Sequence, residues 1–248
     1  MTGPPIRAVF FDVGNTLLYP SPSVSEVCRI VLAEAGHARE PHAIDAYMPL
    51  VDAYYEERYA EDDRFWTDEE RTSSVWIGMY TLLCRKLGIE DEAVSLAHRV
   101  YEEFGLPERW ALYGDVRPAF ERLQSRGIAV GIISNWDRRL ASILYGLGLE
   151  DVLGDVISSA CVGLHKPDPR IFALACERLG VRPDEAAHVG DHHYADYLGA
   201  AATGMRPVLI DRHDAMGDHG VTPIRTLDAL EEALGLACKG YTTEGSER

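Results

Sequence analysis

Lysine is scarce in this chain of 248 residues, which has three lysines among its 24 basic residues. They are Lys86, Lys166 and Lys239, and every other basic side chain is arginine. Arginine and lysine are not interchangeable, because lysine offers a compact, strongly hydrated ammonium. A position that keeps lysine in such a chain is therefore a candidate for a functional ammonium. Chance alone is the alternative explanation for three lysines.

Long apolar runs are absent as well. No stretch of about 18 apolar residues occurs, and the first residues contain no basic region followed by an apolar segment. We therefore expect neither a membrane span nor a secretion signal. The five cysteines are scattered and form no C-x-x-C pair, which argues against a zinc ribbon and is typical of a reducing compartment. A cytoplasmic location is the expectation.

Positive charge is in short supply overall, since 40 acidic residues give a net charge of −16. Such a field opposes binding to nucleic acid or to anionic lipid. The block of residues 21–109 holds nine basic and 19 acidic residues, which accounts for −10 of the total. We expect a small-molecule partner, with no nucleic acid and no membrane, for a chain that is a monomer or a homodimer.

Strand and helix patterns alternate along most of the chain. Short β-rich apolar runs predict strands at residues 6–13, 129–134, 156–159, 187–191 and 207–211. Amphipathic patterns between the later runs predict helices. Alternating β and α elements indicate an α/β fold built on a doubly wound parallel sheet, similar to a Rossmann fold.

Only helical periods follow the first strand. Ser23 and Glu26 form a capping box that opens this segment, and no convincing strand occurs between residues 21 and 104. We therefore predict a core of residues 1–20 and 110–238, an inserted α-helical cap of residues 21–109 hinged near residues 20–22 and 106–113, and a frayed tail of residues 239–248.

Polar residues cluster at the ends of the predicted strands. Open parallel sheets bind ligands beyond the carboxyl ends of their strands. A carboxylate, a hydroxyl, an ammonium and further carboxylates meeting there can act as nucleophile, phosphate cradle, charge clamp and Mg²⁺ site. The candidates are Asp12, Ser134, Asn135, Lys166, Asp191 and Asp196.

Four motifs carry these residues in the order FFDVGNTL, ISNWDRRL, HKPDPRIF and GDHHYADYLGAAATGM. Together they resemble the haloacid dehalogenase superfamily of hydrolases, in the subfamily with a helical cap between the first two motifs. The last three motifs resemble a phosphatase-like branch that includes the "domain-containing 3" type. The resemblance implies a hydrolase, most often a phosphatase.

The resemblance also implies a role for each motif residue. Asp12 would be the nucleophile that forms an aspartyl intermediate, and Lys166 would neutralise it and the phosphoryl oxygens. Thr16, Ser134 and Asn135 would hold the transferring group. The metal ligands for Mg²⁺ would be Asp12, the backbone carbonyl of Gly14, Asp191 and Asp196.

Gly14 departs from the family pattern, because phosphatase members usually carry a second Asp there as general acid and base. Three accounts stay open: the substrate leaves easily, another group supplies the proton, or the transferred group is not phosphoryl. The leading hypothesis is a Mg²⁺-dependent phosphohydrolase acting on a small organic phosphate. The alternatives are a metal-independent 2-haloacid dehalogenase and a catalytically weak binding protein on the same fold.

Further residues are candidates for contacting the substrate or for replacing the missing acid. Arg64 and Trp66 in the helical segment are candidate substrate contacts, or else a surface ion pair and a packed side chain. Tyr19, near the predicted hinge, has a similar claim. His192 and His193 are either exposed loop histidines or a source of the missing proton.

Overall fold

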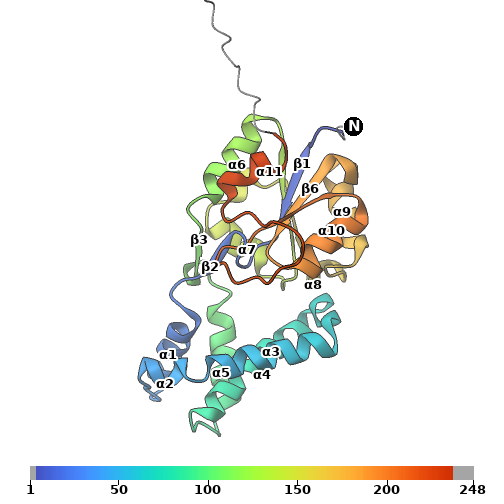
Figure 1. The fold of residues 1–248 in the computed structure, drawn as a ribbon. Coiled ribbons are helices and arrows are strands. Elements are labelled where there is room, and N and C mark those ends of the chain that lie inside the picture. The colour runs from blue at the N-terminus through green and yellow to red at the C-terminus, as the bar shows by residue number, and fades with distance from the viewer. Residues whose placement is uncertain (1–3, 237–248) are drawn as a thin grey trace, which may run out of the picture.

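The centre of the molecule is a sheet of five parallel strands in the order β5-β4-β1-β6-β7 (Figure 1). The structure is a computed structural model and describes residues 4–236. The strands are β1 (Ala8–Phe11), β4 (Ala129–Ser134), β5 (Asp155–Ser158), β6 (Ala186–Gly190) and β7 (Arg206–Leu209). The first strand of the chain therefore lies in the middle of the sheet, paired with β4 and β6.

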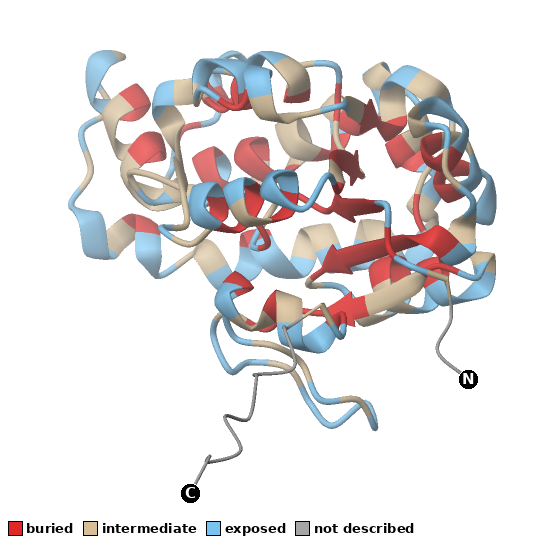
Figure 2. Cartoon of the chain, turned by 90° about the horizontal axis from the view of Figure 1, so that it is seen from above, coloured by how far each residue is buried: buried red, intermediate tan, exposed pale blue. Residues whose placement is uncertain are grey.

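Strand β1 is apolar throughout because both of its faces are covered. Val9 and Phe11 belong to one buried apolar cluster, and Ala8 and Phe10 belong to another. Successive side chains of a strand point to opposite faces, so these clusters are the two halves of the core. Figure 2 shows the strands among the buried parts of the fold, with exposed residues on the outer helices.

Helices cover both faces of the sheet. The cluster that contains Phe11 includes side chains from α6 (Val116–Ser125), α7 (Leu140–Gly146) and α11 (Leu230–Ala233). The cluster that contains Phe10 includes side chains from α9 (Pro169–Leu179) and α10 (Gly199–Thr203). Shorter turns are η2 (Pro107–Arg109), η3 (Glu150–Val152), α8 (Ser159–Val162), η4 (Pro183–Glu185), the π-helical η5 (His193–Leu198) and η6 (Leu227–Ala229). This arrangement confirms the predicted doubly wound α/β fold.

The helical elements of residues 24–103 form a separate layer, which we call the helical block (Figure 1). Ser23 caps its first helix by accepting the backbone N–H of Glu26 at 3.3 Å, as predicted. The block has an apolar cluster of its own. Its elements are α1 (Val24–Glu34), α2 (Pro41–Asp45), α3 (Met48–Glu61), the turn η1 (Asp63–Thr67), α4 (Glu69–Lys86) and α5 (Ala93–Glu103).

A short antiparallel ribbon joins the block to the sheet. It consists of β2 (Leu18–Pro20) and β3 (Trp110–Leu112), which lie in the two segments that the sequence presents as hinges. Both connections therefore pass through one paired ribbon, and hinge motion at these segments stays a prediction. Across residues 4–236, no helix is long and apolar enough to cross a membrane. The predicted tail of residues 239–248 lies outside the described residues.

Candidate active site

The carboxyl ends of the three central strands bring predicted site residues to one edge of the sheet. Asp12 follows β1, Ser134 ends β4 and Asp191 follows β6. The backbone N–H of Asp12 donates to the carbonyl of Val189 at 2.8 Å, which continues the pairing of β1 with β6. Parallel pairing of β1 with both neighbours is therefore what gathers these side chains.

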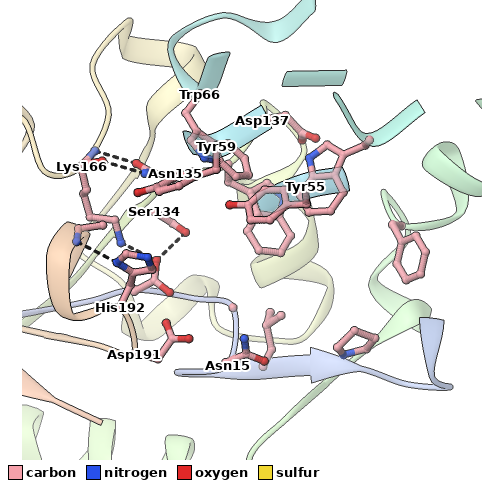
Figure 3. A pocket seen from close by; sticks show the side chains of 18 of the residues that line it. Asn15, Tyr55, Tyr59, Trp66, Ser134, Asn135, Asp137, Lys166, Asp191 and His192 are labelled. Atoms are coloured by element: carbon pink, nitrogen blue, oxygen red, sulfur yellow. Dashed lines mark hydrogen bonds and ion pairs between the residues drawn. The ribbon is translucent and has the colours of Figure 1, made fainter. Parts of the chain in front are cut away.

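Lys166 is buried among carboxylates at this edge (Figure 3). Its Nζ donates to Asp12 Oδ1 at 2.6 Å and to Asp196 Oδ1 at 2.5 Å. Burial opposes the charged ammonium, but the negative charges of Asp12 and Asp196 outweigh it and raise the pKa of Lys166. The lysine is therefore charged in the folded protein, with its charge shared between two carboxylates.

Asn135 and Ser134 are engaged by neighbouring protein groups. The Asn135 side chain donates to the carbonyl of Lys166 at 3.0 Å and accepts the N–H of Lys166 at 2.8 Å. Ser134 Oγ donates to Asp12 Oδ1 at 3.0 Å. Its amide thus holds the backbone of Lys166 in place, and its predicted contact with the substrate stays a prediction.

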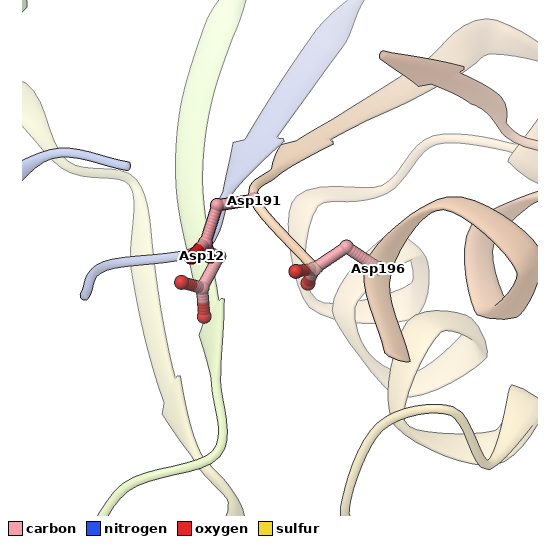
Figure 4. A group of neighbouring side chains, drawn as sticks. All are labelled: Asp12, Asp191 and Asp196. Carbon is pink, nitrogen blue, oxygen red and sulfur yellow. The ribbon is translucent and has the colours of Figure 1, made fainter. Parts of the chain in front are cut away.

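Three carboxylates meet at the same point (Figure 4). One oxygen from each of Asp12, Asp191 and Asp196 lies within 4.8 Å of the others. Burial raises the pKa of Asp191 well above its usual value, and the charges of Asp12 and Asp196 raise it further. Burial also raises the pKa of Asp12. Three carboxylates and one ammonium leave an excess of negative charge, and carboxylate oxygens are the ligands that Mg²⁺ prefers, so the donor set fits that ion.

Asp196 differs from the other two carboxylates, because both of its oxygens are engaged. Besides Lys166, Oδ1 lies 2.8 Å from His188 Nε2, and Oδ2 accepts the backbone N–H of His192 at 3.0 Å. Burial works against ionisation, yet Lys166 and His188 lower the pKa of Asp196. A Cβ at Gly190 would lie 2.2 Å from Asp196 Cγ, so only glycine leaves room for this carboxylate. Asp196 thus helps to hold Lys166 in place, and its role as a metal ligand stays a prediction.

The turn after Asp12 contains the family's missing acid position. A Cβ at Gly14 would meet Trp136 Cζ3 at 3.6 Å, an ordinary contact, so packing leaves space for a side chain there. Asn15 has a left-handed backbone with φ of 53°, which asparagine tolerates. Thr16 is fully buried and its Oγ1 donates to Asp191 Oδ1 at 3.5 Å, so its contact is with a carboxylate.

A cavity of about 500 Å³ lies between this edge and the helical block. Asp12, Ser134, Lys166 and Asp191 are at its floor. Figure 3 shows Tyr55, Tyr59 and Trp66 gathered on one side of Ser134, with Asp191 and Asn15 on the other. Nine aromatic side chains line its walls: Tyr55, Tyr59, Trp66, Trp76, Tyr80, Tyr101, Phe104, Trp110 and Trp136.

Comparison with known proteins shows the family of this chain. The family model of haloacid dehalogenase-like hydrolases matches residues 6–204. The chain belongs to this family. Haloacid dehalogenase-like hydrolase domain-containing protein 3 of Danio rerio is 32% identical over 232 residues, which cover 92% of this chain and 95% of the relative.

Other relatives of this hydrolase carry different activities in their names. Glyceraldehyde 3-phosphate phosphatase of Methanopyrus kandleri is 30% identical over 218 residues, with 84% of each chain covered. The crystal structure of 2-haloacid dehalogenase from Pseudomonas syringae pv. Tomato DC3000 superposes with a TM-score of 0.64 at 26% identity, covering 93% of this chain and 98% of that one. Family membership therefore shows that the chain is a hydrolase. Its substrate has to be inferred from the site.

Of the predicted contacts outside the motifs, the hydrolase brings only some to the cavity. Arg64 does not line the cavity: its guanidinium is exposed and pairs with Asp62 at 2.7 Å, and its predicted substrate contact stays a prediction. Trp66 lines the cavity, but Tyr19 does not. His192 lines the cavity, whereas the ring of His193 stacks on His219 at 4.3 Å.

The sequence reasoning missed most of the aromatic wall and the residues that brace it. Asp137 accepts the backbone N–H of Arg139 at 2.9 Å and the hydroxyl of Tyr101 at 3.0 Å. The guanidinium of Arg139 lies 3.6 Å from the centre of the Tyr101 ring. A pair of tyrosines at positions 55 and 59, one helical turn apart, was the available signal. Such spacing also fits an ordinary packed helix face, which is why it was missed.

Proposed function

We propose that this hydrolase is a Mg²⁺-dependent phosphohydrolase that acts on a small organic phosphate, with Asp12 as the nucleophile. The observation that supports it most is the position of Asp12 between the Lys166 ammonium and the Asp191 carboxylate. A carboxylate attacking a phosphate dianion needs positive charge beside it. Lys166 supplies one charge, and a divalent cation at Asp12 and Asp191 supplies the rest.

The hydrogen bonds of Asp12 indicate which oxygen attacks. Its Oδ1 accepts from Ser134 and Lys166, and no described residue donates a hydrogen bond to Oδ2. In the proposed reaction, Oδ2 attacks phosphorus in line, and the bond to the leaving oxygen breaks with its electron pair. Water then attacks the phosphorus of the aspartyl phosphate, which releases inorganic phosphate and restores the carboxylate.

The proposed metal ligands are Asp12, Asp191 and the carbonyl of Gly14, with Asp196 close by as the fourth predicted ligand. When bound, Mg²⁺ would neutralise charge developing on the phosphoryl oxygens. Lys166 would bind the same oxygens. Asn135 holds its backbone, and Asp196 accepts a hydrogen bond from its ammonium. Its burial and paired backbone bonds keep it from moving away while the substrate binds.

We also propose that residues 21–109 act as a cap on the core of residues 1–20 and 110–238. Several contacts hold the block against the core near the cavity. His165 Nε2 lies 3.3 Å from Asp63 Oδ1, and the backbone N–H of Arg138 donates to Glu69 at 2.9 Å. Opening and closing at these contacts would admit the substrate and then exclude water.

A 2-haloacid dehalogenase is the second candidate, because Gly14 offers no acid and a departing halide needs none. Phosphate release from 4-nitrophenyl phosphate with Mg²⁺ or EDTA, and halide release from 2-chloropropionate, separate the two. We expect phosphate release that EDTA and Asp12→Asn abolish. Halide release in EDTA would replace the proposal with dehalogenation, and silence in both assays would leave a binding protein.

Metal binding has a readout that does not need turnover. Mg²⁺ at 100 times its Kd adds about 2.7 kcal/mol to the free energy of unfolding, so the unfolding temperature rises with Mg²⁺. We expect Asp191→Asn to remove this rise. Asp91→Asn, an exposed aspartate in the helical block, is the matched control and keeps it. A wild-type protein that Mg²⁺ does not stabilise would contradict the proposed ligand set.

A further inference from the structure

Three aromatic rings of the cavity form a wall on the helical block. Tyr55 and Trp76 stack with ring centroids 5.6 Å apart and planes 18° apart. Trp66 packs edge-on against Tyr55 at 6.4 Å and against Trp76 at 6.0 Å. These rings hold one another in place, so the wall exists before any ligand binds.

A second group of rings reaches the nucleophile. Trp110 packs against Trp136 with centroids 5.2 Å apart, and Phe104 lies 5.7 Å from Trp110. Trp136 is the ring that a Cβ at Gly14 would touch. Aromatic rings therefore line the cavity both on the helical block and beside the turn that follows Asp12.

Positive charge is missing from the rest of the cavity. Among the described residues that line it, Lys166 and Arg139 are the only lysine or arginine, and His192 is the only histidine. Arg139 is engaged, since its guanidinium donates to Asp137 Oδ2 at 2.6 Å and lies over the Tyr101 ring. Glu56 also lines the cavity. A second anionic group on the substrate would find no free lysine or arginine to bind.

Two buried polar atoms at the cavity have no hydrogen-bond partner among residues 4–236. Trp66 Nε1 and the Tyr59 hydroxyl are buried and make no hydrogen bond. Trp66 is only 6% exposed. Burial raises the pKa of Tyr59 to about 12, so its hydroxyl keeps its proton. Buried donors normally have acceptors, so these two suit a neutral oxygen or nitrogen acceptor on a ligand.

We infer that the substrate is a phosphate ester of a flat aromatic alcohol that carries no second anionic group. This deepens the proposed phosphohydrolase function and rests on it. The inference also accounts for Gly14. Phenolic hydroxyls ionise near pH ~10, far below the pKa of about 15.7 of water, so an aryl oxygen departs without the acid that an alkyl oxygen needs.

Tryptophan fluorescence tests the ring preference directly, because all four tryptophans of the chain line this cavity. The probes are three phosphonates that cannot be hydrolysed: benzylphosphonate, propylphosphonate and 3-phosphonopropionate. With Mg²⁺ present, we expect benzylphosphonate to bind at least tenfold more tightly than propylphosphonate. The probe with the added carboxylate should bind most weakly. Equal affinity for benzyl and propyl probes, or tightest binding of 3-phosphonopropionate, would overturn the inference.

Variants assign the preference to the wall. Trp76→Leu removes a stacked ring and should lower the benzyl-to-propyl affinity ratio about tenfold, with the remaining three tryptophans as reporters. Trp66→Phe keeps a ring and removes the Nε1 donor. Tyr145→Leu is the control, because Tyr145 is an exposed aromatic residue of α7 that does not line the cavity. A ratio that falls equally in the control contradicts the inference, and thermal melts verify that each variant folds.

Turnover separates this inference from the function on which it rests. Acetyl phosphate has no ring, and its acetate leaving group departs without a proton. It is therefore compared with phenyl phosphate. Hydrolysis of both with no ring preference in the fluorescence assay would keep the phosphohydrolase and overturn the aromatic inference. A ring preference without hydrolysis of either compound would keep the aromatic site and overturn the phosphohydrolase.

Discussion

Lys166→Met is expected to destabilise the protein strongly, because it leaves two buried carboxylates without their cation. Lys166 is 2% exposed, and its Nζ lies 2.6 Å from Asp12 and 2.5 Å from Asp196. Removing one partner from a buried ion pair costs about 3–5 kcal/mol. At about 2–4 °C per kcal/mol for a chain of this size, the unfolding temperature should fall by about 6–20 °C.

Circular dichroism melts in EDTA at pH 8 measure this change. Lys86→Met is the matched control, since Lys86 is exposed near the end of α4 and its loss should shift the midpoint by less than about 2 °C. The two variants remove the same group from the same kind of side chain, so only burial and pairing distinguish them. A Lys166 variant as stable as the wild type would refute the reasoning.

The effect should also depend on pH. Without the ammonium, burial leaves the folded-state pKa values of Asp12 and Asp196 above the unfolded value of ~3.9. The folded variant then binds more protons than the unfolded chain, so its stability falls as pH rises above that value. The gap between variant and wild type is therefore expected to be smaller at pH 5 than at pH 8. A gap that widens towards pH 5 would contradict the assignment to these carboxylates.

Two glycine substitutions test the rest of the site. Gly14→Asp places a carboxylate where a Cβ has room. A positioned general acid typically raises the rate ~10²–10⁴-fold, so we expect phosphate release from propyl phosphate to rise at least tenfold. Unchanged alkyl turnover would count against a missing acid. Gly190→Ala puts a Cβ 2.2 Å from Asp196 Cγ, which should cost about 1–3 kcal/mol of stability and lower kcat more than it changes KM. Gly114→Ala, where nothing lies within 4 Å, is its control, and equal effects of the two would refute the role given to Gly190.

The strands of the sheet are the part of the fold that the sequence predicts best. Each observed strand of the parallel sheet begins within two residues of its predicted start, because short apolar runs buried on both faces are bounded by turn residues. The convergence of Asp12, Ser134 and Asp191 follows from parallel pairing alone. The ribbon of β2 and β3 does not, since two three-residue strands about ninety positions apart carry no periodic signal.

Side-chain partners were less accessible from sequence than strand positions. Asn135 and Lys166 are 31 residues apart, and their reciprocal hydrogen bonds depend on how two loops meet at the sheet edge. Arg64 is the reverse case, because its partner is close in sequence: its guanidinium donates to Asp62, two residues away.

The helical block is acidic, so anion recognition cannot come from its net charge. Its Arg64 and Arg71 both pair with Asp62 at the surface, and the cavity keeps Lys166 as its one cation that faces the nucleophile. The block contributes aromatic rings to the cavity, and rings discriminate by shape and by apolar contact. The positive charge beside Asp12 would thus bind the phosphoryl group of any ester. The aromatic rings of the helical block would select the alcohol that carries it. This division of tasks would explain why one lysine is enough at the site, in a chain whose basic residues are mostly arginine.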